Sequence, residues 1–395
     1  MNPTWESTQN FILLPELKLI THWQSDKFRT HYKCRKESEF EVCPKCATKS
    51  FSVHDRRWVK IQDQPIRGSG IRLHVLKRRF RCPGCKKVFT EPLNGVRKGF
   101  KTTERFRRGV KWACENFADL KRVCRAYSCS AWLVNKVFYE QLDIKWHERM
   151  NDPWGKRIGI DEHSWRKCRK EKITEFASLI VDYDRGRIGE VVNGKTVQAM
   201  KDALAYIPGR DRVEQAVIDM CDPFKKFIKD FFPNAIVIAD KFHVLRLLNP
   251  AINKARTEIT GDKRSNPVRR LMLRNRHKLK YYERNALDLW LAQHPKLKEI
   301  YWYKEALHKF YRTRGIEKAT KVFIHLIDQM ALSQLKEIKT LRKTLMKWRK
   351  EILNYFVTGL TNGKTEGYNR LAKLYQYRAF GYRSFFNYRL RLLNA

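Results

Sequence analysis

Short apolar runs separated by turn residues fill residues 1–100, and this pattern predicts β-structure. The clearest strands are predicted at residues 12–23 and 71–82. From residue 101 to residue 145 the apolar positions take a helical spacing instead. The positions that share one helical face are Phe106, Val110, Ala113 and Cys114.

Two more helices are predicted after this first one. A short helix is expected near residues 119–124, followed by a turn at 126–128. The next helix is expected to run through Phe138, with Ser130 as its N-cap. Residues 151–156 contain a proline and a glycine and are predicted to form a linker.

Strand-like patterns return at residue 157. The predicted strands are residues 157–165, 175–183, 187–194, 215–220 and 235–242. Helices are predicted at residues 197–207 and 224–232, between the later strands. The order β-β-β-α-β-α-β predicts an α/β fold with hairpins at one edge of a mixed sheet.

Residues 244–355 are predicted to be helical. One apolar stripe comprises Leu335, Ile338, Leu341, Leu345, Trp348, Ile352 and Phe356. The basic positions between these residues are expected to form a solvated face, with a DNA-binding face as the alternative.

The net charge of the chain predicts its class of partner, whereas the rest of its composition predicts only that it folds. The 395 residues carry a formal net charge of +42, and such a basic surface favours nucleic acid as a partner. The 43% of hydrophobic residues are enough to build cores for two or three domains. An anionic membrane is a weaker alternative, because no apolar run is long enough to span a bilayer. The start MNPTWESTQN lacks the features of a signal peptide, so a cytosolic location is expected.

Two CxxC knuckles predict a zinc site. Cys43 and Cys46 form the first knuckle, and Cys82 and Cys85 form the second. Two such turns supply four thiolates to one tetrahedral ion and leave no open position, so the zinc is expected to be structural. The alternative is a redox or free-thiol role. The nearby residues Cys34, His54 and His74 are expected to be bystanders.

The three helices of residues 101–145 resemble a helix-turn-helix module, with residues 130–140 as the candidate recognition helix. Side chains suited to phosphate or base contact there are Ser128, Ser130, Asn135 and Lys136. The alternative is a three-helix cap on the next domain.

Two acids follow apolar runs of the predicted strands. Asp161 follows Ile160, and Asp219 follows Ile218. If the two strands are neighbours, both side chains emerge at one end of the sheet, where they can bind divalent metal. For either residue alone, the ordinary alternative is a turn cap.

Glu366 is the third candidate acid, and it lies at the start of a predicted helix. Thr365 is expected to cap a helix beginning at Glu366, on which Asn369 and Lys373 share the face of the glutamate. Beyond this point basic and aromatic residues alternate, as suits DNA backbone contact and base stacking. The basic ones are Arg370, Lys373, Arg378, Arg383, Arg389 and Arg391.

These motifs together resemble the ISL3 family of insertion-sequence transposases over almost the whole chain. The resemblance includes the paired knuckles with RRFRCPGC, GIDEHSW, VIDMCDPF, IVIADKFHVLRLLN, TNGKTEGYNRLAK and RAFGYRSFFNYRLR. It implies an RNase H-like catalytic core interrupted by a helical insertion, and DDE chemistry in which a freed 3′-OH attacks target DNA.

The resemblance also implies roles for individual residues. Asp161, Asp219 and Glu366 match the catalytic, metal-binding acids by position, and Lys373 matches a basic residue that often follows the glutamate. Asp240, with His243, is the rival for the second acid, but the strand order favours Asp219. Glu162 is expected to point to the opposite face of its strand. The residues expected to contact DNA are Asn135, Lys136, Asn369, Lys373, Arg378 and Arg383.

The expected domains are a zinc ribbon (1–100), a helix-turn-helix domain (101–150), the first part of the core (151–243), the insertion (244–355) and the C-terminal helical part of the core (356–395). Catalytic Mg²⁺ or Mn²⁺ and structural Zn²⁺ are the expected metals. The expected partners are double-stranded DNA, as terminal inverted repeats and target, and further copies of the chain in a dimer or larger assembly. The expected location is the bacterial cytoplasm, at the nucleoid.

Two alternatives to a transposase remain. A zinc-ribbon and helix-turn-helix DNA-binding regulator without catalysis explains residues 1–145 equally well, but it leaves the acids unexplained. A nuclease without strand transfer uses the same acids, and only a strand-joining assay separates it from a transposase.

Overall fold

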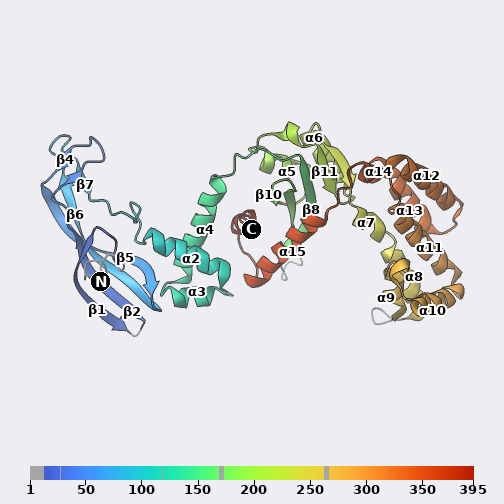
Figure 1. The fold of residues 1–395 in the computed structure, drawn as a ribbon, viewed down its shortest axis with the longest axis horizontal. Coiled ribbons are helices and arrows are strands. Elements are labelled where there is room, and N and C mark those ends of the chain that lie inside the picture. Colours follow the sequence, from blue (N-terminus) through green and yellow to red (C-terminus); the bar gives the residue numbers. More distant parts are fainter. Residues whose placement is uncertain (1–12, 27, 118, 169–172, 262–266) are drawn as a thin grey trace, which may run out of the picture. The chain divides into compact units, whose positions relative to one another are not determined.

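The fold comes from a computed structural model that describes residues 13–26, 28–117, 119–168, 173–261 and 267–395. The chain forms two compact units, Met1–His147 and Glu148–Ala395 (Figure 1). The segment on which the absence of a signal peptide was predicted, and the first residue of the strand predicted at 12–23, lie outside the described residues.

The first unit begins with β-structure. Its strands are β1 (Leu17–Asp26), β2 (Arg29–Lys36), β3 (Glu41–Val42), β4 (Lys49–Ser50), β5 (Val53–Ile66), β6 (Ser69–Arg81) and β7 (Val88–Thr90). Within the described residues, one five-stranded sheet has the order β1-β2-β6-β5 with β7 beside β6, and β3 pairs with β4. The β5–β6 hairpin turns at Arg67 and Gly68, whose positive φ angles of 49° and 79° suit a tight hairpin of this twist.

The predicted strands in this unit are confirmed as β1 and β6, but β2 and β5 were not predicted. Both are rich in charged residues, because only one face of the sheet is buried. That buried face packs Ile61, Ile71, Leu73 and Val75 into a core with the N-terminal leucines. A half-buried strand shows weak apolar alternation when its outer face is highly charged.

Three helices complete the first unit: α2 (Glu104–Asn116), α3 (Leu120–Ala126) and α4 (Ala131–His147). Phe106, Val110 and Ala113 are fully buried on α2, as the helical spacing predicts. The hydroxyl of Ser130 accepts a hydrogen bond from the Leu133 amide, which confirms it as the cap of α4. The expected end at Phe138 is wrong: α4 continues because Leu142, one turn further, is also buried in the unit.

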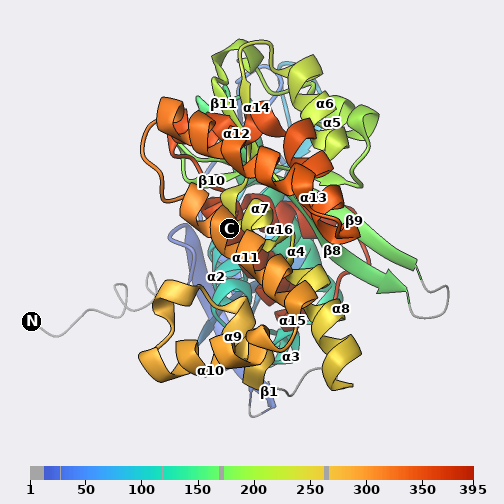
Figure 2. The same cartoon turned by 90° about the vertical axis from the view of Figure 1, so that its right-hand side faces the viewer.

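The second unit is built on a mixed sheet. Its strands are β8 (Arg157–Cys168), β9 (Ile173–Asp182), β10 (Arg187–Asn193), β11 (Gln215–Ile218) and β12 (Ile236–Ala239). Their spatial order is β10-β9-β8-β11-β12. The first three are antiparallel, and β11 runs parallel to both β8 and β12. This confirms the predicted order of strands and helices. The β8–β9 pair projects beyond the other strands as a ribbon (Figure 2).

Helices surround this sheet and extend from it. They are α5 (Val197–Leu204), α6 (Asp222–Phe231), α7 (Lys241–Arg246), α8 (Asn249–Thr260), α9 (Pro267–Leu273), α10 (Tyr281–Ala292), α11 (Pro295–Phe310), α12 (Ile316–Leu332), α13 (Lys336–Lys347), α14 (Arg349–Thr358), α15 (Gly363–Arg378) and α16 (Phe385–Leu393), with short 3-10 turns at Arg210–Arg212 and Arg276–Lys278. Figure 1 shows α8 to α13 gathered at one side of the sheet, between α7 and α14. One continuous apolar core joins the sheet to these helices.

Two predictions near this sheet are corrected. The strand predicted at residues 235–242 ends at Ala239, because Asp240 caps α7 instead of continuing the strand. The linker predicted at 151–156 is part of the fold: Trp154 is 2% exposed and packs edge-on against Phe232. The apolar stripe of residues 335–356 is confirmed, although it runs over two helices that meet at Trp348.

A buried ion pair fixes the C-terminal helix to the sheet. The fully buried Glu190 of β10 accepts hydrogen bonds from the Arg389 guanidinium at 2.6 and 2.5 Å and from the Tyr206 hydroxyl at 2.5 Å. Arg391, two residues later, is buried with its guanidinium over the Tyr375 ring. Two arginines of the basic C-terminal stretch, Arg389 and Arg391, therefore stabilise the fold.

Replacing Arg389 with Met is expected to destabilise the packing of α16. The carboxylate of Glu190 would stay buried without its charged partner, which costs about 3 kcal/mol. Amide hydrogen exchange in α16 and β10 should accelerate by about 100-fold. The exposed Arg383→Met is the matched control, and Glu190→Gln/Arg389→Met should recover part of the protection. Unchanged exchange in Arg389→Met would contradict this role.

Candidate active site

Three aspartates are brought side by side by the register of the parallel strands. Ile160, Ile218 and Ala239 are paired across β8, β11 and β12. The next residue on each strand is Asp161, Asp219 or Asp240. Because paired positions in parallel strands face the same side of a sheet, the three carboxylates share one side. Asp161 lies inside its strand, as predicted, and β8 continues beyond it to Cys168 in pairing with β9.

A glycine lets helix α15 lie close to this row. Gly159, two residues before Asp161, faces the same side of β8, and a Cβ atom there would collide with the hydroxyls of Thr365 and Tyr183. The two hydroxyls hydrogen-bond each other at 2.8 Å. The helix begins at Gly363, so the expectation that Thr365 caps it is wrong. Thr365 is fully buried inside the first turn because it packs over Gly159.

Asp161 lies in a pocket of amide donors. Its carboxylate accepts a hydrogen bond from the Asn369 amide of α15 at 2.6 Å and one from the Glu162 backbone at 2.7 Å. Burial and the adjacent Asp219 carboxylate raise the pKa of Asp161 to about 7. The two acids follow paired residues of neighbouring strands, as the sequence predicts. The Glu162 side chain is instead paired with Lys195, 3.3 Å away.

Asn362 joins the strands that carry the acids. This residue is 1% exposed. Its side-chain amide donates to Asp219 Oδ1 at 3.3 Å and approaches the Ile160 carbonyl at 3.4 Å. Its backbone amide donates to Asp240 Oδ1 at 3.0 Å. In the sequence, Asn362 lies in a turn-like stretch before Gly363. The only local signal was an Asn-Gly pair, and nothing in it pointed to distant aspartates.

Asp240 and His243 form the other side of the cluster. Asp240 is fully buried, and its second oxygen caps α7 by accepting the His243 amide at 3.1 Å. The His243 imidazole lies 2.9 Å from Asp219 and 3.7 Å from Asp240. Hydrogen bonds to these two acids raise the pKa of His243 to about 10.

Glu366 stays apart from the aspartates in this arrangement. Its carboxylate lies 3.9 Å from the Arg246 guanidinium of α7. Among the described residues, Asp219, Asp240 and His243 form a group whose ligand atoms all lie within 4.8 Å, whereas Asp161, Asp219 and Glu366 do not. Lys373, on the same helix, is exposed. The structure thus joins two of the three predicted acids and leaves the third on the neighbouring helix.

The donor set suits a divalent cation. Two neighbouring carboxylates repel each other unless a proton or a cation lies between them. Burial and, after it, the nearby Asp219 carboxylate raise the pKa of Asp161. Carboxylate oxygens are the ligands that Mg²⁺ and Mn²⁺ prefer. Asp219 is better placed for this than Asp240, because both oxygens of Asp240 are occupied by backbone amides.

The four knuckle cysteines form a second metal-binding group. Cys43, Cys46, Cys82 and Cys85 come together, with Sγ atoms 3.6 Å apart for Cys43–Cys85 and 3.4 Å apart for Cys46–Cys82. Thiolates on a tetrahedral zinc are separated by about 3.8 Å. A hydrogen bond from the Thr48 hydroxyl lowers the pKa of Cys46 to about 6, which favours the thiolate.

The two knuckles have the same backbone geometry. In each, the residue after the second cysteine has a positive φ, 57° at Ala47 and 59° at Lys86, and its amide donates to the carbonyl of the first cysteine. The predicted bystanders lie outside this group: Cys34 is in the other core, His54 is exposed and His74 bonds His31.

The residues predicted to contact DNA are mostly on the surface. Asn135 and Lys136 are exposed on α4, where the Lys136 ammonium lies over the Trp132 ring. Arg383 is exposed and Arg378 is partly exposed. Asn369 differs from the others, because it is buried and its amide group is committed to Asp161. The aromatic residues of the C-terminal stretch also fall into two groups: Phe380 is 93% exposed, whereas Tyr388 is buried in the core.

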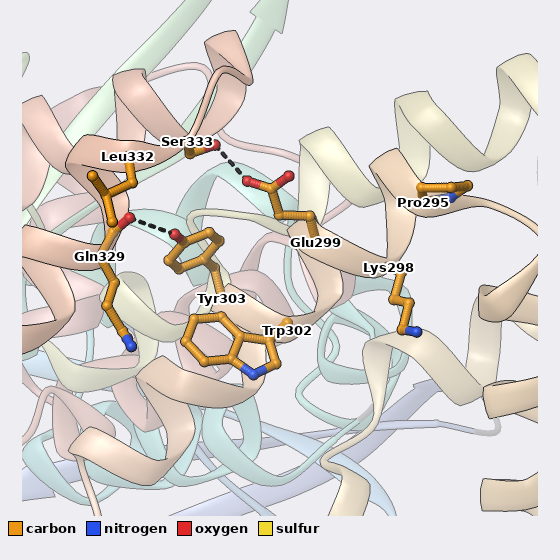
Figure 3. Close-up of a pocket in the computed structure, with 8 residues that line it drawn as sticks. All are labelled: Pro295, Lys298, Glu299, Trp302, Tyr303, Gln329, Leu332 and Ser333. Carbon is orange, nitrogen blue, oxygen red and sulfur yellow. Dashed lines mark hydrogen bonds between the residues drawn. The ribbon is translucent and has the colours of Figure 1, made fainter.

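A cavity of about 530 Å³ lies between α11 and the junction of α12 with α13 (Figure 3). Trp302 and Tyr303 form its wall, and the Ser333 hydroxyl holds the carboxylate of Glu299 at 2.5 Å. None of the residues of the aspartate cluster lines this cavity. The acidic row is therefore the stronger candidate for chemistry.

Comparisons with known proteins match both metal-binding groups. A family model described as a transposase of ISL3 elements matches residues 158–392. A second model, the zinc-finger of transposase IS204/IS1001/IS1096/IS1165, matches residues 39–85. The chain is 23% identical over 382 residues to the transposase for insertion sequence element IS1001 of Bordetella parapertussis, covering 91% of this chain and 90% of that protein.

The chain is also 25% identical over 264 residues to the transposase for insertion sequence element IS1557 in two strains of Mycobacterium tuberculosis. These matches cover 58% of this chain and 57% of those proteins. A search of the described helices finds none with the length and apolar character needed to cross a membrane.

Replacing Gly159 with Ala should push α15 off the sheet. The added methyl group collides with Thr365 and Tyr183 in a packed core, so a loss of about 1–3 kcal/mol in the free energy of unfolding is expected. Gly367→Ala on the exposed side of α15 meets no atom within 4 Å and should be neutral or stabilising by up to about 1 kcal/mol. Urea unfolding measures both, and equal stability of the two variants would refute the close approach.

Removing zinc should unfold the knuckles and leave the large sheet folded. The core beside the knuckles contains only a few buried side chains, so it depends on the metal. Metal analysis should find one zinc per chain, and Cys46→Ser should lose it and show faster hydrogen exchange at residues 41–50 and 80–90. Cys34→Ala, a buried cysteine of the other core, should retain zinc. Full zinc content in Cys46→Ser would disprove the assignment.

Proposed function

The chain belongs to the ISL3 transposase family, and from this premise we propose that it is a DDE transposase of an insertion sequence. It binds the terminal inverted repeats of its element, cleaves the DNA and transfers the strand through attack of a 3′-OH. The observation that carries the proposal is the position of Asp161 beside Asp219, in a row of acids held by asparagines from α15.

We assign Asp161, Asp219 and Glu366 as the metal-binding catalytic acids. Bound Mg²⁺ or Mn²⁺ would stabilise the attacking and leaving oxygens of the phosphodiester. Glu366 lies on the helix whose Asn369 holds Asp161, and in this role its side chain would turn from Arg246 to the metal. We assign Asp240 a positioning role, because its oxygens hold Asn362 and the start of α7.

Protein side chains prepare the site before DNA arrives. Asn369 orients Asp161, and Asn362 orients Asp219, so that neither carboxylate has to reorganise when it binds its ligands. Lys373 is exposed two helical turns along α15 from Glu366 and is suited to hold a DNA phosphate near the acids. The nucleophile is water in the first step and a DNA 3′-OH in the second, attacking in line.

The spatial order β10-β9-β8-β11-β12, with three antiparallel strands followed by two parallel ones, supports an RNase H-like core formed by residues 151–243 and 356–395. Residues 244–355 would be its helical insertion. In the first unit, residues 1–100 would form a zinc-ribbon domain and residues 101–150 a helix-turn-helix domain, both binding DNA. The exposed Asn135 and Lys136 support α4 as the recognition helix.

Arg378 and Arg383, beside the exposed Phe380, suit backbone contact and stacking at a DNA end. Joining two ends of one element implies a homodimer or larger assembly on double-stranded DNA at the nucleoid. A DNA-binding regulator without catalysis remains the second candidate. That function does not explain why Asp161 and Asp219 lie next to each other in a buried setting.

Cleavage of DNA that carries the terminal repeats of the element tests the proposal. Asp161→Asn, Asp219→Asn and Glu366→Gln should each lower Mg²⁺-dependent nicking by at least about 100-fold, since several kcal/mol of charge stabilisation is lost. DNA binding in EDTA should be unaffected. Glu162→Gln, a neighbouring acid paired with Lys195, is the matched control.

If Asp161→Asn or Asp219→Asn nicks DNA as fast as the unaltered chain does, the catalytic assignment is refuted. Binding that is indifferent to Mg²⁺, without any nicking by the unaltered chain, would favour the regulator. Joining of the cleaved end to a target duplex distinguishes a transposase from a nuclease.

A further inference from the structure

The large sheet of the first unit has one apolar face and one basic face. Along β6, Ile71, Leu73 and Val75 enter the core. Arg72 and His74 alternate with them and lie on the other side. The register extends this second face across the sheet, because Arg72 is paired with His31 and Gln62, while His74 is paired with Lys33 and Lys60.

The centre of the basic face is a fixed cluster of rings. The Trp23 ring stacks on His31 with centroids 4.9 Å apart and planes 7° from parallel. His31 Nδ1 and His74 Nε2 share a hydrogen bond of 2.9 Å, and His31 Nε2 bonds the Ser25 hydroxyl at 3.0 Å. These contacts hold the outer face rigid without a covering layer, since Trp23 is 40% exposed.

Four cations surround this cluster: Arg29, Lys33, Lys60 and Arg72. Burial and the neighbouring cations lower the pKa of both His31 and His74, and Asp26 is the acid that opposes this effect at His31. Among the ion pairs of the described residues, none includes any of the four cations. Burial and the nearby Arg29 also lower the pKa of Arg72.

Some other cations of the same sheet are paired with acids. Lys18 and Arg35 share Glu37, at 3.3 and 2.9 Å, and Arg79 binds Asp55 at 2.8 Å. Among the ion pairs of the described residues, none balances the positive charge around the imidazole pair. A cluster of unneutralised cations on a rigid surface is costly unless an anion binds there.

The basic face continues toward helix α4. A Cβ atom at Gly70, on this face of β6, would collide with the side chain of Ser128 in the turn before α4. The side-chain amide of Gln62 donates to the Tyr127 carbonyl of the same turn at 3.3 Å. The four cations therefore lie on the sheet surface that leads to the helix carrying the exposed Asn135 and Lys136.

We infer that this face, defined by Arg29, Lys33, Lys60 and Arg72, binds the phosphate backbone of duplex DNA next to the segment contacted by α4. This inference rests on the DNA-binding role proposed for the first unit and gives it a second surface. A duplex fits better than a single strand. His31 stacks on one face of Trp23, and Lys33 lies 4.6 Å over the Trp58 ring, so one face of each tryptophan is already in contact with a neighbouring side chain.

The test compares two triple variants of the full chain. Lys33→Gln/Lys60→Gln/Arg72→Gln removes three cations of the face, and Lys18→Gln/Arg35→Gln/Arg79→Gln removes three that are paired with Glu37 or Asp55. The probe is a fluorescent duplex of about 30 base pairs of arbitrary sequence, because backbone contacts are independent of sequence. Binding is measured by anisotropy in EDTA from about 0.05 to 0.3 M salt.

The face variant should bind at least about tenfold more weakly at 0.1 M salt, and the slope of log K against log salt should fall by about 2 to 3. The control should change the slope by less than about 1. The charge-preserving Lys33→Arg/Lys60→Arg/Arg72→Lys should bind as the unaltered chain does. Zinc content and melting temperature verify that each variant is folded.

Equal affinity and equal slope in the face variant and the unaltered chain would overturn the inference, as would tighter binding of a single strand of the same length. Neither result bears on Mg²⁺-dependent nicking by the aspartate cluster, which is measured separately. Absence of nicking in the unaltered chain, with a reduced salt slope in the face variant, would refute the catalytic proposal and leave this surface standing.

Discussion

Placing carboxylates side by side in a largely buried setting is costly, and the second unit is organised around that cost. The register of three parallel strands puts Asp161, Asp219 and Asp240 in one row. The compensation comes from amide donors and one imidazole: Asn369 and Asn362 from α15, and His243 from α7. The segments that supply these donors are far apart in sequence, so the row of acids also determines where the helices must return to the sheet.

That return constrains the surrounding residues. Helix α15 can lie close to β8 only because Gly159 has no side chain, and the Thr365 hydroxyl of α15 then hydrogen-bonds the Tyr183 hydroxyl. At the far end of the sheet, the Glu190–Arg389 pair holds α16. The long helical segment between α7 and α14 leaves the sheet after β12 and rejoins it where Asn354 of α14 donates to the Val237 carbonyl of β12. It also shares the apolar core of the sheet.

The first unit faces a different constraint, because a highly charged chain must stay folded. Its core is thin near the knuckles, where four thiolates gathered for one ion replace apolar packing. The large sheet buries one face and leaves a rigid basic face outside. Metal binding and surface charge are therefore separated in this unit. The metal-binding knuckles maintain the fold, and the basic face of the large sheet is available to bind a polyanion.

The sequence by itself determined the features that depend on local pattern. Helical spacing located α2, apolar runs located β8 to β11, and the spacing of cysteines identified the metal ligands, because each of these is encoded within a few neighbouring residues. The same patterns misplaced the end of β12 and the start of α15, where Asp240 and Asn362 act on distant partners. Only the tertiary structure decided which acids meet, since strand register and the approach of α15 depend on contacts across as many as 212 residues. Charge alone also could not separate structural from surface arginines: Arg389 is held by a buried glutamate, whereas Arg383 is exposed, because burial is a property of the folded chain.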